Sequence, residues 1–225
     1  MNAFRNLAAA AVISWLAAVP AQAVDLNSIT FAQFTQQGTD KIAQYANTGT
    51  GNTISIAESP AFFTVNTYGP PGSYPSVMEM QAASSALITS VGPQFEQGGW
   101  AGFIKFGDGS NFLTANFSNA TFSFDGSGGS ASMISTDPVH MISYTSNFLN
   151  LPVFDFRNLA LAFTGLTPPF TVAANGFGSD FNANVAGSFA GSAVPEPSGW
   201  LMMLAGFGCI GLATRRRTMV SAIAA

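Results

Sequence analysis

The segment from Val24 to Val194 is built from short apolar runs in which apolar and polar residues alternate, and this pattern constrains the fold more than any other feature. Phe, Val, Ile and Thr recur in the runs, and clusters of Gly, Asn, Asp, Ser and Pro separate them. Residues 159–163 and 181–189 have apolar side chains at nearly every second position. Because a period of two indicates a half-buried strand, and no Lys/Glu-rich amphipathic stretch has a helical period, we expect antiparallel strands of about 5–8 residues.

Strands at this spacing predict an all-β fold, a single antiparallel β-sandwich of jelly-roll-like type that covers residues 24–190. Leu113, Ala115 and Phe117 are at odd-numbered positions, whereas Phe122 and Phe124 are at even-numbered ones, so a bulge or tight turn is expected near Asn119-Ala120. Residues 69–75 and 127–130 are expected to be a loop and a turn. Val77–Thr89 fits either a strand followed by a loop or a short helix, and its even apolar spacing favours a strand at its start.

Charge is scarce in this segment and mostly negative. Charged residues make up 8% of the chain, and the only cations from Val24 to Val194 are Lys41, Lys105 and Arg157, against ten acids. Nucleic-acid binding needs Lys and Arg to displace counterions, so this class of partner is excluded. The only cysteine, Cys209, lies outside the segment, which therefore offers no disulfide, thiolate metal site or cysteine nucleophile.

The N-terminus predicts a signal peptide at residues 1–23. Arg5 precedes an apolar run at residues 7–19, and Ala21 and Ala23 form an Ala-x-Ala site for signal peptidase. The run is shorter than the roughly 20 residues needed to span a bilayer, so we expect cleavage after Ala23. The alternative is a buried N-terminal helix.

The C-terminus combines a proline-stiffened tripeptide, an apolar stretch and a cationic cluster. Pro195 and Pro197 fix their own φ angles and bias the preceding residues away from helix, which leaves an extended backbone that a protease or transpeptidase can hold. Residues 198–217 predict a transmembrane helix. Its 17 residues before the arginine cluster span about 25 Å, which is less than the hydrocarbon core of about 30 Å and therefore short for a permanent membrane anchor. Its notable residues are Trp200, Gly206, Gly208, Arg215, Arg216 and Arg217.

These C-terminal residues resemble the PEP-CTERM sorting signal. The resemblance covers Pro195-Glu196-Pro197, Trp200, the glycine core with Gly206 and Gly208, and the cluster Arg215 to Arg217. It implies recognition by an exosortase and export in a Gram-negative bacterium that makes extracellular polysaccharide. A linker is expected at residues 191–197, before the apolar stretch. The membrane contact would be made through the helix before processing. Leu201 and the extra cytoplasmic tail 218–225 depart from the family pattern, and a plain membrane anchor is the alternative.

Little in the segment points to catalysis. His140 is the only histidine, so a multi-histidine metal site is excluded, and no metal or other cofactor is expected. The loops at Asp108-Gly109 and Asp125-Gly126 could supply oxygen ligands to Ca²⁺, but Asp-Gly is also ordinary hairpin-turn chemistry. A resemblance to domains that often precede this sorting signal, carried by Gly102 to Phe106, Phe112 to Phe124, Tyr144 to Leu149 and Leu161 to Leu166, implies no activity.

Three functions are therefore considered for the segment. The leading expectation is a non-enzymatic cell-surface or extracellular-matrix protein linked to exopolysaccharide. The second is a lectin-like protein in which Tyr68, Tyr74 and Trp100 stack on sugar rings, although core packing explains such residues equally simply. The third is a secreted glycosidase that uses two carboxylates from Glu79, Glu96 and Asp108.

Overall fold

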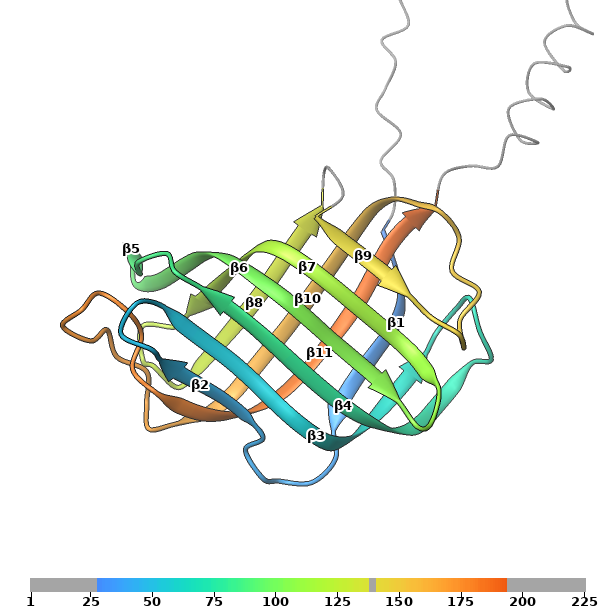
Figure 1. Cartoon of the computed structure of the whole chain (residues 1–225), viewed down its shortest axis with the longest axis horizontal. Coiled ribbons are helices and arrows are strands. Elements are labelled where there is room, and N and C mark those ends of the chain that lie inside the picture. Colours follow the sequence, from blue (N-terminus) through green and yellow to red (C-terminus); the bar gives the residue numbers. More distant parts are fainter. Residues whose placement is uncertain (1–27, 138–140, 194–225) are drawn as a thin grey trace, which may run out of the picture.

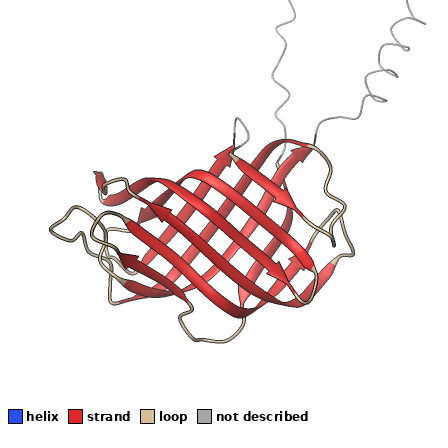
Figure 2. Ribbon diagram, viewed as in Figure 1, coloured by secondary structure: helices blue, strands red, loops and turns tan. Residues whose placement is uncertain are grey.

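The computed structural model describes residues 28–137 and 141–193, and the chain forms eleven strands there (Figures 1 and 2). They are β1 (Ile29–Gln36), β2 (Ala43–Asn47), β3 (Asn52–Val65), β4 (Gly72–Ser84), β5 (Thr89–Val91), β6 (Gln94–Gly107), β7 (Asn111–Phe124), β8 (Ser130–Asp137), β9 (Ile142–Thr145), β10 (Phe154–Thr167) and β11 (Phe181–Ala193). The antiparallel all-β prediction is confirmed.

Eight of these strands close into an up-and-down barrel. Around the ring the order is β1, β3, β4, β6, β7, β8, β10 and β11, and β11 pairs again with β1. Every pairing is antiparallel, and the strands of the near and far walls cross each other in Figure 1. The predicted jelly-roll-like sandwich is therefore wrong, because one sheet curls onto itself where two separate sheets were expected.

The short strands complete the wall. β2 pairs with β11 and β3 beyond the end of β1, so that β1 and β2 occupy one position in the ring with a loop between them. β9 pairs with the first half of β7, whereas β8 pairs with its second half. β5 forms a small hairpin with β6 at one end of the barrel.

Bulges explain why the strands are longer than the expected 5–8 residues. β3, β6, β7 and β10 each have 14 residues, and β3 shifts its register against β4 between Ile56 and Ser59. Such a shift reverses which residues face inward, so one long strand reads in the sequence as two short ones. The bulge expected near Asn119 is confirmed: β7 continues through it, and Asn119 has a φ of 58°.

Two local predictions are confirmed and one is partly wrong. Residues 127–130 form the turn into β8, and β4 covers the start of the segment from Val77. However, β4 already begins at Gly72, inside the stretch expected to be a loop, and Pro75 pairs with Phe62 on β3. A neighbouring strand thus overrides the turn preference of the Pro- and Gly-rich residues.

Aromatic rings fill the barrel interior. Phe34, Phe63, Phe106 and Phe189 are buried in its middle, and further rings occupy each end. At one end Phe31 stacks on Phe154, with ring centroids 5.3 Å apart; at the other Tyr45 stacks on Phe181 at 4.5 Å. The cysteine-free domain therefore obtains its core mainly from phenylalanine, whose rings each bury a large apolar area.

One polar network lies within the aromatic core, at the end of the barrel that holds Tyr45. Tyr45 Oη donates to Gln97 Oε1 at 2.9 Å, and Gln97 Nε2 donates to Asn52 Oδ1 at 3.0 Å. Asn52 in turn accepts from the amide of Gly178 and donates to its carbonyl oxygen, which ties the loop after β10 to the barrel. Burial, with a smaller contribution from Asp180, raises the pKa of Tyr45 well above its usual value. The phenol therefore stays protonated and keeps donating.

Candidate functional site

A groove runs along the outer face of β3, β4 and β6. Four adjoining depressions of about 530, 290, 420 and 350 Å³ share lining residues from one to the next. Glu58 and Glu79 belong to the first two, Ser55 and Gln81 to the second and third, and Thr53 to the third and fourth. We call this continuous feature the outer groove.

Strand alternation creates the outer groove. On β4 the side chains of Met78, Met80 and Ala82 are buried, so Glu79, Gln81 and Ala83 face outward. The outward positions around Ala83 carry small residues, which leaves the sheet surface hollow there; they are Thr53, Ser55 and Ala101. Phe103 on β6 is half-buried and lines the same hollow, so part of its ring faces solvent.

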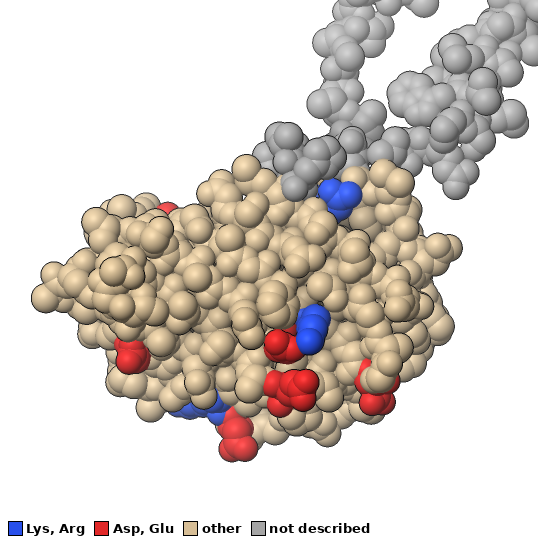
Figure 3. Space-filling model, in the orientation of Figure 1, with Lys and Arg blue, Asp and Glu red and all other residues tan. Residues whose placement is uncertain are grey.

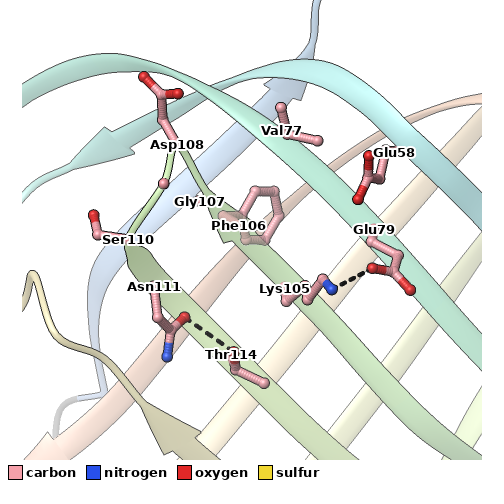
Figure 4. Close-up of a pocket in the computed structure, with 11 residues that line it drawn as sticks. Glu58, Val77, Glu79, Lys105, Phe106, Gly107, Asp108, Ser110, Asn111 and Thr114 are labelled. Carbon is pink, nitrogen blue, oxygen red and sulfur yellow. Dashed lines mark hydrogen bonds and ion pairs between the residues drawn. The ribbon is translucent and has the colours of Figure 1, made fainter.

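A small charged cluster lies at the end of the outer groove near the β6–β7 turn (Figure 4). Lys105 forms an ion pair with Glu79, its cross-strand partner on β4, and Glu58 on β3 lies beside them. The hydrogen bond from Lys105 to Glu79 holds the pKa of the lysine above its usual value, and the charge of Glu58 adds to the effect. Glu58 and Lys105 were not candidates in the sequence, because only the β3–β4–β6 pairing brings them to Glu79.

Of the three predicted catalytic acids, Glu79 and Glu96 are too far apart to act as a pair. Glu79 lies opposite Lys105, nine positions along β6 from Glu96, which is roughly 25–30 Å at 3.3 Å per residue. Glycosidase carboxylates are about 5–10 Å apart. Asp108 shares the cleft with Glu79, but its carboxylate is directed away from the ion pair in Figure 4.

Both Asp-Gly stretches are hairpin turns, as their simpler interpretation predicted. Asp108 and Gly109 connect β6 to β7, and Gly109 has a φ of 74°. Asp125 turns the chain from β7 into β8, and its carboxylate accepts hydrogen bonds from Ser127, Gly129 and Ser130. Within the described residues no group of three His, Cys, Asp or Glu side chains is placed to hold a metal ion.

The predicted sugar-stacking residues are parts of the core and its edge. Trp100 is 0% exposed and packs between Tyr45 and Phe122, so it cannot meet a ligand from outside. Tyr68 and Tyr74 are half-buried, and the hydroxyl of Tyr74 donates to the carbonyl oxygen of Pro70. Phe103, which the sequence analysis did not single out, is a partly exposed aromatic side chain of the outer groove, whereas Phe106, which also lines it, is buried.

Charged side chains are few on the face of the barrel in Figure 3, and several lie toward the lower edge of that view. Most of the visible surface carries neither sign of charge. This agrees with the scarcity of charge in the sequence, and it makes the Glu58–Glu79–Lys105 cluster a distinct feature of the surface.

Several predicted sites lie outside the described residues. They are His140, the signal-peptidase site Ala21 and Ala23, and the sorting-signal residues Pro195, Glu196, Pro197, Trp200, Gly206, Gly208 and Arg215 to Arg217. The predicted transmembrane helix 198–217 is outside them as well. In the part of the chain that is described, no helix has the length and apolar character needed to cross a membrane.

The described chain ends directly before the sorting signal. β11 runs to Ala193 and so includes residues 191–193, which the sequence analysis placed at the start of the linker. Pro195 follows after a single intervening residue, Val194. The processing signal is therefore attached to a strand that is paired on both sides, with β1 and with β10.

Comparison with known proteins identifies this C-terminal segment. Residues 193–217 match the family model of the PEP-CTERM protein-sorting motif, whereas no curated protein and no solved structure matches the chain. The match covers the tripeptide, the apolar stretch and the arginine cluster on which the sequence prediction depended. The chain is therefore a PEP-CTERM protein and an exosortase substrate.

Proposed function

We propose that the chain is a cell-surface or extracellular-matrix protein of a Gram-negative bacterium, processed at both ends, whose barrel acts without catalysis in an exopolysaccharide layer. The observation that carries the proposal is the sorting motif at residues 193–217, which implies export and exosortase processing. The barrel supports a non-enzymatic role, because Glu79 is engaged by Lys105 and Glu96 is far from both.

The test of processing is to express the full chain with and without the exosortase gene and to follow the mass of its C-terminus. We expect loss of the segment that contains Arg215 to Arg217 only when the enzyme is present, and release from the inner membrane with it. The mature N-terminus should be Val24. A product that keeps the arginine cluster and stays in the inner membrane in both strains contradicts the proposal.

A second candidate function, glycan binding, is favoured by the outer groove. An extended sugar chain needs a long open surface, amide groups that bond hydroxyls, and an apolar platform for the sugar ring. The groove provides the exposed amide side chains Gln44 and Gln81 and the partly exposed ring of Phe103. Because Glu58 and Glu79 outnumber Lys105 at one end, neutral or amino-sugar polymers fit better than polymers of uronic acids.

Glycan binding is tested by affinity electrophoresis of the full chain in gels that contain neutral, amino-sugar or uronic-acid polysaccharide. Phe103→Ser should weaken binding to the preferred polymer at least fivefold, because the apolar platform is lost. Phe62→Ser is the matched control, since Phe62 is 37% exposed on β3 but does not line the groove. Equal binding by wild type and both variants would remove the groove from consideration.

The glycosidase alternative is examined with the same polysaccharides. We expect no release of reducing ends by the wild-type protein. Turnover that disappears in Glu79→Gln or in Glu58→Gln would overturn the non-enzymatic proposal and assign chemistry to the charged cluster.

A further inference from the structure

The barrel end from which β11 leaves has an unusual apolar border. Ile29 at the start of β1 pairs with Gly191 on one side of β11, and Phe154 at the start of β10 pairs with Ala193 on the other. Val153 directly precedes Phe154. The last residues of β11 are therefore flanked by Ile29 on one side and Val153 on the other. In Figure 1 both termini of the barrel lie at this end.

The flanking side chains are exposed, although they are apolar and β-branched. Val153 is 79% exposed, the highest value among the large hydrophobic residues of the described chain, and Ile29 is 50% exposed. We call Ile29 and Val153 the exit rim. Single exposed apolar residues need no explanation, but a pair that borders the strand from which the sorting signal leaves the fold does.

The length of chain beyond β11 limits where the processing enzyme can act. Pro195 is two residues from Ala193 and Pro197 is four, so even a fully extended chain places them within about 7 and 14 Å of the barrel. An enzyme that closes around this tripeptide therefore meets the barrel end. Trp200 is seven residues from Ala193, a reach of at most about 25 Å, which keeps the barrel end close to the membrane surface.

We propose that the exit rim is a docking surface for the exosortase, so that the folded barrel forms part of the substrate that the enzyme recognises. This inference rests on the exosortase assignment, and it adds a contact that the sorting motif at residues 193–217 does not contain. Ile29 and Val153 suit this role because β-branched side chains lose little rotamer freedom when a partner covers them. The occupant is the enzyme and not the lipid, since the enzyme must reach a tripeptide within about 14 Å of the rim.

The first test compares processing rates of the full chain in the strain that carries the exosortase. The double variant Ile29→Asp, Val153→Asp removes the apolar rim at exposed positions. The matched control is Leu87→Asp, Val91→Asp, two residues that are 59% and 49% exposed near β5, at the opposite end of the barrel. In a pulse-chase experiment we expect the rim variant to lose its C-terminal segment at least fivefold more slowly, and the control to match wild type.

The unfolding temperatures of both variants are measured in parallel, so that a folding defect is recognised. Equal processing rates for the rim variant and wild type overturn the docking proposal while the exosortase assignment stands. If wild type itself is not processed in this strain, both the assignment and the docking proposal fail.

The second test identifies what touches the rim, and it does not depend on the aspartate variants. A photoreactive amino acid at position 153 of the full chain, compared with one at position 87, should form an adduct with the exosortase only from position 153. Adducts with lipid alone, or none, overturn the proposal.

A ten-residue Gly-Ser spacer between Ala193 and Val194 should slow processing, because it moves the tripeptide away from the exit rim. Faster processing would mean that the barrel only obstructs the enzyme.

Discussion

Asp125 organises the whole β7–β8 turn through one carboxylate. Its Oδ1 accepts from the amide of Ser127 at 2.9 Å, from the hydroxyl of Ser127 at 2.6 Å and from the amide of Gly129 at 3.2 Å, and its Oδ2 accepts from the hydroxyl of Ser130. Hydrogen bonds from Ser127 and Ser130, followed by those from the backbone, hold the pKa of Asp125 well below its usual range. Four hydrogen bonds thus converge on this carboxylate, three of them on Oδ1.

The depressed pKa of Asp125 gives a pH-dependent prediction. A carboxylate whose pKa is lower in the folded than in the unfolded state stabilises the fold above about pH 4, and this contribution is lost as the pH falls through the folded pKa. Asp125→Asn should therefore cost about 1 kcal/mol at pH 7, and less at pH 3. Urea unfolding of both proteins at the two pH values measures the difference. An equal cost at pH 7 and pH 3 would show that the charge of Asp125 plays no part.

At the scale of the strand, β6 and β4 approach each other more closely than side chains allow. Gly102 on β6 faces Ala82 on β4, and a Cβ atom at Gly102 would lie 2.1 Å from the carbonyl oxygen of Gln81. That oxygen belongs to the backbone and cannot rotate away. The register of β6 against β7 also shifts between Trp100 and Gly102, so the glycine marks a point where the barrel wall bends.

Gly102→Ala should destabilise the barrel by about 2 kcal/mol or more, because the added methyl group pushes β6 away from β4. Gly98→Ala on the same strand is the control, since a Cβ atom there meets nothing within 4 Å. Chemical unfolding of the two variants measures the difference, and we expect Gly98→Ala to be neutral or slightly stabilising. If Gly102→Ala is as stable as wild type, the close approach of the two strands is not real.

Individual strands could be predicted from the sequence, but their lengths could not. Residues 159–163 and 181–189 alternate without interruption and lie in β10 and β11 as expected. The alternation around Ile56 and Ser59 breaks at a bulge, so β3 looked like two short strands. A bulge adds one residue and reverses the inward-facing parity, and only the pairing with β4 shows that the strand continues.

For the whole molecule, closure of the sheet was beyond what the sequence could predict. Inward-facing residues alternate in the same way in a sandwich and in a barrel, so the choice depends on which strands meet at long range. The β1–β11 pairing that closes the ring joins residues 29–35 to residues 186–191. For the same reason the sequence could not place Glu58 and Lys105 beside Glu79, or show that Trp100 faces inward.

The closure of the ring predicts that a circular permutant will fold. Ile29 and Gly191 are paired, so a short Gly-rich linker can join residue 193 to residue 29, and new termini can open at Gly109, where the turn is exposed. We expect a soluble protein that unfolds in one cooperative transition, followed by circular dichroism during heating. A second permutant opened at Gly126 should be less stable, because it cuts the turn that Asp125 organises. Aggregation of the Gly109 permutant would contradict this view of closure.

The position of β11 determines how the barrel bears mechanical force. Its hydrogen bonds to β1 and to β10 run roughly perpendicular to the strand, so a pull along the tail loads both ladders in shear and does not open them one bond at a time. A force applied just beyond Ala193 is therefore resisted by the hydrogen bonds to both neighbouring strands at once. A molecule held by this end in flowing water would keep its fold under tension that would unravel a strand paired on one edge only.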